Sequence, residues 1–181
     1  RIAELAGLSM PLAAQRHQAA MVKVDGVDYT MPSVMDYIPH SGETGLYFRH
    51  ERPGQLIAGL HSEDITADVV DPDAYARSAD ADFIELLAEK LMARLPAFET
   101  KAGIGNGWAG LYPVSPDGVP QVGPNPGAER FVTAGGAGGS GIQLSPVIGE
   151  LVAEWIVDGE GRAFSAAERL LPGRDALVGS A

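Results

Sequence analysis

Polar and apolar positions alternate along the first third of the chain, a pattern typical of β-strands with one buried face. Four short segments are rich in β-branched and aromatic residues and are predicted as strands or parts of strands: 15–24, 33–39, 45–51 and 55–62. The last two flank Arg52-Pro53-Gly54, whose length and turn chemistry predict a hairpin. We therefore expect three or four antiparallel strands between residues 15 and 62.

The hydrophobic period changes to about four residues between positions 79 and 95. Asp80 or Ser78 can cap the start of this segment, and Pro96 follows its end. The segment is predicted to be an amphipathic helix with one face on the sheet. Its apolar stripe consists of Phe83, Leu87, Leu91 and Leu95.

The last third of the chain reads as strand, connection, strand and helix. Residues 103–114 are predicted to form a strand entered through glycines, and the proline-rich stretch 113–127 a turn-rich connection rather than a helix or long strand. A short buried strand, 131–134, precedes a helix over 142–157 and a short last helix over 165–171. The expected apolar face of the longer helix is Leu144, Val147, Ile148, Leu151, Val152, Trp155 and Ile156.

Composition narrows the class of protein. Hydrophobic residues make up 45% of the chain, enough for a packed core. The net charge of −11 argues against nucleic acid or an anionic membrane as the main partner. There is no cysteine, and the spacing of the four histidines matches no ligand motif, so no metal site is expected. No apolar run approaches the roughly 18–20 residues of a membrane span, and we expect a cytoplasmic protein.

The chain opens on residues that read as the end of a helix. Residues 1–8 contain an apolar periodic stretch stopped by Gly7, with no initiator methionine. We therefore expect a piece of a longer protein, with a processed N-terminus as the alternative.

The stretch GGAGGSGIQLSP, residues 135–146, carries the most specific local signal. Gly136, Gly138 and Gly141 spell G-x-G-x-x-G after an apolar run and before a helix, as in a dinucleotide-binding fingerprint. That motif also needs a second strand ending in an acid about 20 residues later, and no such strand follows. A nicotinamide-binding domain is therefore disfavoured. The remaining interpretations are a backbone cradle for an anion at a helix N-terminus and a tight turn packed against protein.

Four blocks in order resemble the D-amino-acid oxidase-like flavoproteins, which include glycine and sarcosine oxidases and related amine dehydrogenases. The blocks are MPLAAQRHQ (10–18), GLYFRHERPGQLIAGL (45–60), GWAGLYPVSPDGVPQVGP (107–124) and FVTAGGAGGSGIQLSPVIGELVAEWI (131–156). They cover only the C-terminal half of that family. The family's N-terminal loop, which holds the ADP part of FAD, is absent from this sequence.

The resemblance implies roles for particular residues. The late glycine loop of the family faces the flavin ring, and the following helix points its N-terminus at the pyrimidine end of that ring. The corresponding cofactor-binding residues would be Gly136, Gly138, Gly139, Ser140, Gly141, Ile142 and Gln143. Candidate catalytic or substrate-contacting residues are Tyr112, Tyr47 and Arg49, the last two on one face of the predicted hairpin. For Tyr112 a structural role in a strand is equally open, and for Arg49 a solvated surface position.

Several positions depart from better-known members of the family. Ser140 stands where many members have histidine, Gly139 where glycine oxidases have arginine, and Gln143 where sarcosine oxidases have lysine. Gly110 replaces the cysteine that attaches FAD covalently in some of them. These departures put oxidase activity in doubt, leave dehydrogenase activity open, and leave the substrate unspecified.

Together these patterns predict an α+β fold: a mostly antiparallel substrate-domain sheet with a covering helix, and a C-terminal strand-loop-helix segment that completes an FAD-binding domain. Residues 1–8 would be the tail of the missing FAD-binding domain, 9–105 the substrate domain and 106–181 the C-terminal segment. The resemblance implies FAD-dependent oxidation of a small amine or amino acid by hydride transfer to the flavin. The alternative is a non-catalytic fragment or subunit that binds no FAD alone and needs a partner chain carrying the ADP-binding half.

Overall fold

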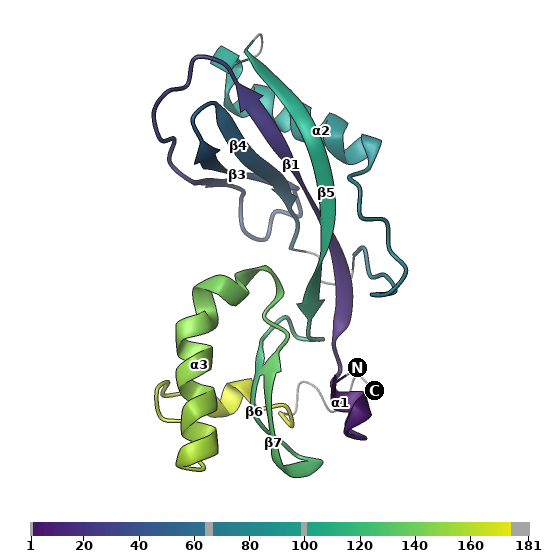
Figure 1. The fold of residues 1–181 in the computed structure, drawn as a ribbon, viewed down its shortest axis with the longest axis vertical. Coiled ribbons are helices and arrows are strands. Elements are labelled where there is room, and N and C mark those ends of the chain that lie inside the picture. Colours follow the sequence, from purple (N-terminus) through teal and green to yellow (C-terminus); the bar gives the residue numbers. More distant parts are fainter. Residues whose placement is uncertain (1, 64–66, 99–100, 175–181) are drawn as a thin grey trace. The chain divides into compact units, whose positions relative to one another are not determined.

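Five strands form the main sheet of the computed structural model, which describes residues 2–63, 67–98 and 101–174. They are β1 (Ala13–Val24), β2 (Val34–Asp36), β3 (Gly45–Arg52), β4 (Gln55–His61) and β5 (Ala102–Val114), in the order β2-β3-β4-β1-β5 (Figure 1). The β1–β4, β2–β3 and β3–β4 pairs are antiparallel. The predicted hairpin is confirmed, and with it the mostly antiparallel α+β fold.

The chain divides into two compact units, which are described separately. The sheet unit comprises Arg16–Leu111, and the glycine-loop unit comprises Arg1–Gln15 with Tyr112–Ala181. The boundary between them falls within β1 and β5. None of the described helices is both long and apolar enough to cross a membrane.

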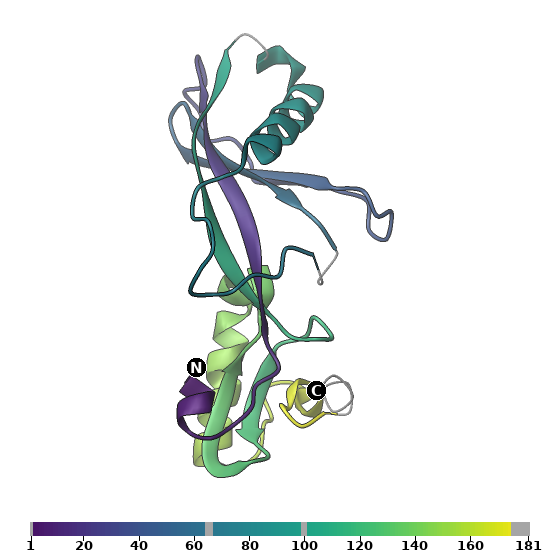
Figure 2. The same ribbon diagram turned by 90° about the vertical axis from the view of Figure 1, so that its right-hand side faces the viewer.

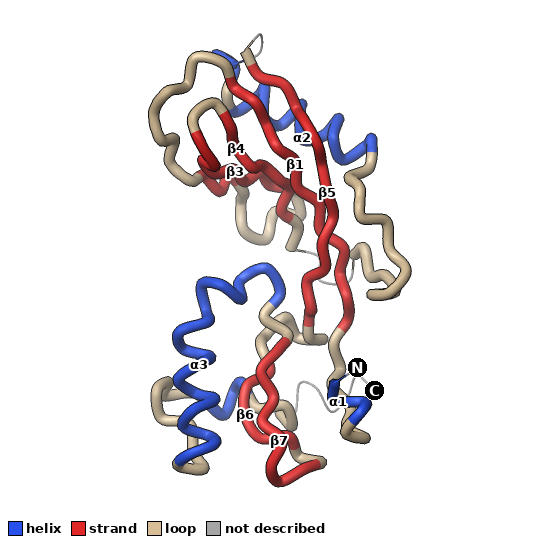
Figure 3. The backbone as a smooth tube through the Cα atoms, in the orientation of Figure 1, coloured by secondary structure: helices blue, strands red, loops and turns tan. Residues whose placement is uncertain are grey.

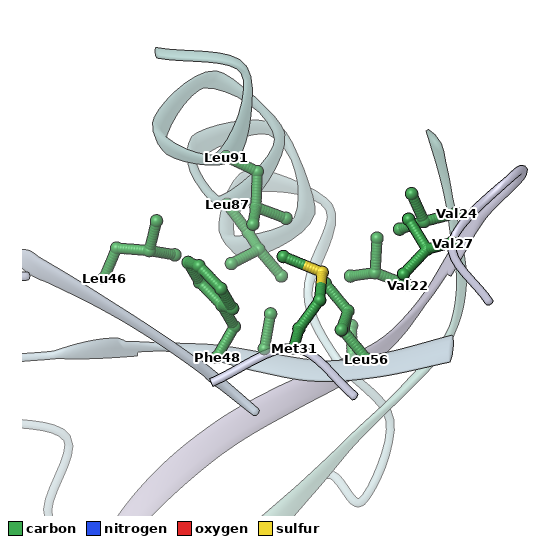
Figure 4. Close-up of a cluster of buried hydrophobic side chains, with 11 residues drawn as sticks. Val22, Val24, Val27, Met31, Leu46, Phe48, Leu56, Leu87 and Leu91 are labelled. Atoms are coloured by element: carbon green, nitrogen blue, oxygen red, sulfur yellow. The ribbon is translucent and has the colours of Figure 1, made fainter. Parts of the chain in front are cut away.

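Helix α2 (Ala81–Arg94) covers one face of the sheet (Figure 2). Alternation along the strands turns Leu46, Phe48 and Leu56 toward this helix, where they meet Leu87 and Leu91 (Figure 4). The predicted stripe of apolar residues four positions apart is confirmed, since Phe83 and Leu95 also pack against this core. The opposite face of the sheet therefore carries the odd-numbered residues of β3 and β4.

Arg16 anchors the irregular segment before α2 to strand β1. Its guanidinium donates to the carbonyl oxygens of Ala76 and Ser78 and to both carboxylate oxygens of Asp80, at 2.6–3.0 Å. Asp80 occupies the N-cap position of α2, but the expectation that its side chain caps the helix is wrong. The carboxylate instead accepts hydrogen bonds from Arg16, which is itself charged, and from Gln18.

The glycine-loop unit is built on a second hairpin. Strands β6 (Gln121–Asn125) and β7 (Ala128–Gly135) pair in antiparallel fashion, and α3 (Gly141–Val157) packs against them (Figure 3). The short helix α1 (Ile2–Leu5) belongs to the same unit and ends before Gly7, whose φ is +72°, as expected. Strand β6 lies inside the proline-rich stretch predicted as a turn-rich connection. Both strands of a two-stranded hairpin are edges, so Pro124 is tolerated there without an N–H to donate.

Helix α3 contains a proline and covers less apolar surface than predicted. Pro146 has no N–H for the carbonyl of Ile142, and the Ser145 hydroxyl donates to that oxygen instead, at 2.9 Å. Leu151 is fully buried in this unit, but Val147 is 43% exposed and Ile156 65%. The two-stranded hairpin is too narrow to cover the whole apolar arc of the helix. The predicted last helix is shorter than expected, a 3-10 helix over Ala167–Leu170.

The loop between β5 and β6 is held by a second arginine. Arg174 donates through Nε and Nη2 to the two carboxylate oxygens of Asp117, both at 2.8 Å, and also to the carbonyl oxygens of Val119 and Pro120. Asp117 is a turn residue, as expected, because it accepts from the N–H of Val119. Its link to a residue 57 positions later was not expected.

We predict that Arg16→Ala lowers the free energy of unfolding by about 1–3 kcal/mol, because two backbone carbonyls and a carboxylate lose their donor. The matched control is Arg94→Ala, which removes the surface ion pair with Asp36, whose partners are 50% and 54% exposed. Its cost should stay below about 1 kcal/mol. Urea unfolding followed by circular dichroism measures both, and equal losses would contradict the anchoring role of Arg16.

Asp117 should make the stability of the chain sensitive to acid. The Arg174 guanidinium, with the Val119 amide and the Ser115 hydroxyl, lowers the pKa of the Asp117 carboxyl to about 2. In the unfolded chain the same carboxyl has a pKa near 3.9, so the unfolded state takes up a proton at a higher pH than the folded state does. This contribution, about 2 kcal/mol, is present above pH 4 and is lost as the pH falls toward 2.

The measurement is the difference in unfolding free energy between the wild type and Asp117→Asn. It should be largest near neutral pH and shrink between pH 4 and pH 2. Asp158→Asn is the control, because its ion pair with Arg162 lies on the surface. A difference for Asp117→Asn that does not vary with pH would show that the carboxylate charge contributes nothing.

Candidate functional site

A glycine-rich turn joins β7 to α3 and contains all the predicted cofactor-binding residues. Gly136 and Gly138 have φ values of +72° and +52°, in the left-handed region that only glycine enters at low cost. A 3-10 turn over Gly138–Ser140 then leads directly into α3 at Gly141. The seven predicted residues thus lie together, partly in the turn and partly at the start of α3. They are Gly136, Gly138, Gly139, Ser140, Gly141, Ile142 and Gln143. This segment, 136–143, is called the glycine turn below.

The glycine turn is closely packed on one side. Gly136 lies against Leu12, where an added Cβ would come within 2.9 Å of the Leu12 Cδ2 atom. Ala137 forms a β-bridge with Val114, so the end of β5 runs beside the turn. At Gly138, by contrast, an added Cβ would meet nothing within 4 Å. The turn therefore has a packed side and an open side.

Tyr112 lies against the glycine turn. A Cβ at Gly139 would come within 2.5 Å of the Tyr112 Cε2 atom, so the aromatic ring occupies the space that any other residue would need. The ring is half-buried and comes from the last part of β5. Among the predicted site residues, the structure thus brings Tyr112 together with the cofactor-binding group.

The N-terminus of α3 is suited to negative charge. Ser140, at the N-cap, makes no capping hydrogen bond through its side chain, and the first turn of the helix contains no acidic residue. The first N–H groups of a helix lack partners within the helix, and the dipole of a 17-residue helix adds about half a positive charge at this end. An anion or a polarised carbonyl can be bound here by backbone donors alone.

Tyr47 and Arg49 lie in the sheet unit, on the face of β3 turned away from α2, and so share one face as predicted. Their register partners on β4 are Gly59 and Ile57. The Arg49 guanidinium forms an ion pair with Glu51 at 2.7 Å and donates to the His50 carbonyl oxygen at 3.1 Å. The charge that was expected to bind a substrate carboxylate is thus already paired, and the side chain is 54% exposed.

Two features of the surroundings were not predicted. One is the Asp117–Arg174 pair, since nothing in the sequence links the S-P-D-G turn to an arginine so far away. The other is the approach of His17, His61 and Tyr37, whose rings share the face of Tyr47. Burial lowers the pKa of His17, Asp68 raises it and His61 lowers it, so the two imidazoles act on each other electrostatically. The alternation of side chains along β1 and β4 could have placed His17 and His61 on one face of the sheet. The register that brings them close together did not follow from the sequence.

The described residues after α3, 158–174, contain no strand. The second strand of a βαβ nucleotide-binding unit is therefore missing from the part of the chain that the structure describes. The glycine turn and the helix N-terminus remain, with their hydrogen-bond donors on the backbone.

Comparison with known proteins agrees with this geometry. The model of the FAD dependent oxidoreductase family (DAO) matches residues 1–155. FAD-dependent oxidoreductase domain-containing protein 1 of Xenopus laevis is 33% identical over 159 residues, which are 86% of this chain and 30% of that protein. The crystal structure of glycine oxidase from Geobacillus kaustophilus superposes with a TM-score of 0.72 at 25% identity, over 96% of this chain and 42% of that one.

L-proline dehydrogenase from P. horikoshii has the same fold, with a TM-score of 0.75 at 24% identity over 93% of this chain and 42% of that one. The chain thus spans less than half the length of each of these relatives. The sequence match to the Xenopus protein covers 86% of this chain, and the structural match to the glycine oxidase covers 96% of it. The chain belongs to the DAO family of FAD-dependent oxidoreductases.

Proposed function

We propose that the chain is the C-terminal portion of an FAD-dependent oxidoreductase that oxidises an amine or amino acid at a CH–NH bond. The observation that carries the proposal is the glycine turn, which enters the uncapped N-terminus of α3 with Tyr112 packed against Gly139. The family description and the glycine oxidase relative support the class of reaction.

The residues of the glycine turn fit the isoalloxazine ring of FAD. The Ser140 N–H already donates to the Ala137 carbonyl oxygen, so the donors suited to the carbonyl oxygens of the pyrimidine end are backbone N–H groups in the first turn of α3. The open side at Gly138 leaves room for a flat group. FAD, when bound, supplies the acceptor for the hydride that leaves the carbon next to the amine. The positive end of α3 stabilises negative charge at this place through fixed dipoles.

Tyr112, Tyr47 and Arg49 are the proposed substrate-contacting residues. The tyrosine hydroxyls can donate to a carboxylate or accept from an amine, and they bring no charge. Arg49 can serve a carboxylate only by exchanging or sharing its partner Glu51. Each of these side chains would therefore contribute by positioning the substrate more than by a free charge.

The proposal also assigns segments of the chain to two domains. Residues 9–105 would form the substrate domain, whereas residues 1–8 and 106–181 would complete the FAD-binding domain. The ADP-binding half would come from outside this chain, because the chain spans 42% of the glycine oxidase. That ratio also favours a second candidate, a subunit that binds no FAD alone and acts only with a partner chain.

We predict that FAD added to the chain together with the missing N-terminal half gives a shifted and quenched flavin spectrum. Gly139→Ala should weaken this binding about 5- to 150-fold, because the added Cβ must displace the Tyr112 ring at a cost of about 1–3 kcal/mol. The control is Gly149→Ala on α3, where the Cβ meets nothing within 4 Å. Fluorescence titration measures all three affinities.

FAD bound by this chain alone contradicts the dependent-subunit candidate. Binding only with the N-terminal half present agrees with both candidates, which then differ in whether that half belongs to the same polypeptide. Failure to bind in both cases refutes the flavoenzyme proposal itself.

A further inference from the structure

A cleft of about 310 Å³ lies beside α2 in the sheet unit. One wall is the C-terminal half of α2, with Lys90 and Arg94, and the other is the segment from the end of β2 to the start of β3, with Ile38 and Glu43. The buried side chain of Leu46, which is turned toward α2 in Figure 4, lines the cleft as well. The volume is within the range of small-molecule sites, roughly 300–1,000 Å³.

The cleft and the proposed substrate-contacting residues of the sheet unit lie on opposite faces of the sheet. Leu46 lines the cleft, whereas Tyr47 and Arg49 of the same strand are on the face turned away from α2. None of the described residues that line the cleft belongs to the glycine turn or is a proposed substrate-contacting residue. A molecule in the cleft would therefore occupy a site that the proposed reaction does not use.

Two of the charged side chains in the cleft neutralise each other. Arg94 Nε lies 3.1 Å from Asp36 Oδ2, an ion pair that links α2 to β2. The Lys90 side chain, by contrast, is half-buried and has no ion pair or hydrogen bond within the described part of the chain. The carboxylates of Glu43 and Glu89 are likewise unpaired among the described residues. The cleft thus offers both an unpaired ammonium group and unpaired carboxylates to an occupant.

These charges narrow the class of occupant. A simple anion would meet the two glutamate carboxylates, and a simple amine would meet the Lys90 ammonium, so part of the lining repels either one. No group of three or more potential metal ligands occurs among the described residues, which argues against a metal ion. The cleft also offers apolar contacts, because Ile38 is 66% exposed and Ala93 lies on the helix wall. An occupant with a carboxylate, an ammonium group and an apolar body satisfies all of these features.

We propose that the cleft is a second binding site, separate from the reaction, for a free α-amino acid with an apolar side chain. The Lys90 ammonium binds the carboxylate of the amino acid, and the Glu43 carboxylate on the opposite wall accepts hydrogen bonds from its ammonium group. The apolar side chain covers exposed surface of Ile38 and Ala93. Binding at this place does not depend on the proposed function, because it involves neither FAD nor the glycine turn.

The test titrates L-leucine at neutral pH into the full ¹³C-labelled chain without FAD and follows the chain by ¹H–¹³C NMR. We expect saturable shifts at the methyl signals of Ile38, Thr44 and Ala93, all three of which line the cleft. Two probes each lack one charged group of leucine: 3-methylbutylamine has no carboxylate, and 4-methylpentanoate has no amine. Each should bind at least about threefold more weakly than leucine, because one of the two charge contacts is lost.

Two variants should change the binding of these probes in opposite directions. Lys90→Met should weaken binding of leucine and of 4-methylpentanoate about two- to fivefold without weakening that of 3-methylbutylamine. Glu43→Gln should weaken binding of leucine and of 3-methylbutylamine by a similar factor and spare 4-methylpentanoate. Lys23→Met and Glu85→Gln are the matched controls, because both side chains are exposed and neither lines the cleft. Circular dichroism checks folding, and Glu43→Gln, a change at an exposed position, decides the question if Lys90→Met unfolds.

Three results would overturn the proposal. The first is the absence of saturable shifts at the three methyl groups, including the case in which leucine shifts only the rings of Tyr47 or Tyr112. The second is equal binding of leucine and of either probe with a single charge. The third is leucine binding that changes no more in Lys90→Met and Glu43→Gln than in the two control variants.

Discussion

Tyr112 can lie against the glycine turn only because Gly139 has no side chain. The same constraint recurs in the sheet unit, where Gly45 and Gly59 make room for Tyr37 and Tyr47. The rings of Tyr112 and Tyr47 occupy the volume that a Cβ at Gly139 or Gly59 would need, and the Cβ of Tyr37 occupies that volume at Gly45. The positions of the three tyrosines are thus fixed by glycines on neighbouring segments, and the proposed cofactor and substrate contacts depend on this arrangement.

Two arginines hold irregular segments in place by hydrogen bonds to their backbone carbonyl oxygens, as neighbouring strands do for each other in a sheet. Arg16 and Arg174 are only 11% and 10% exposed, and each donates both to a carboxylate and to backbone carbonyls of a loop. Five donors in a rigid plane suit this task, because one side chain can fix several acceptors at once. One anchor holds the segment that leads into α2, and the other holds the loop that runs beside the glycine turn.

The parts of the fold that depend on local pattern were predictable from the sequence. The β3–β4 hairpin, the stripe of α2 and the glycine entry to α3 each follow from periodicity and turn chemistry within about 15 residues. The partners of Asp80 and Asp117 were not predictable, because Arg16 and Arg174 lie 64 and 57 positions away in the chain. The exposed edge of α3 was also missed, since helical periodicity reveals an apolar face but not the width of the surface that covers it.

The same limit applies to the candidate site. Glycine spacing identified the turn, but it could not show that Gly139 touches a ring from β5 or that Gly138 is open. Alternation placed Tyr47 and Arg49 on one face, but the ion pair with Glu51 depends on rotamers that sequence patterns do not encode. The approach of Tyr37, His61 and His17 depends on the registers of three strand pairs at once.

Ser145 gives the beginning of α3 a property that an unbroken helix lacks. The carbonyl oxygen of Ile142 is held by a hydroxyl group rather than by a backbone N–H, because Pro146 has none to offer. A hydroxyl reorients by rotation about a single bond, with no change in the backbone. The carbonyl can therefore be released to solvent or to another donor while the rest of the helix stays wound, which makes the first turn of α3 a place where the site can adjust locally.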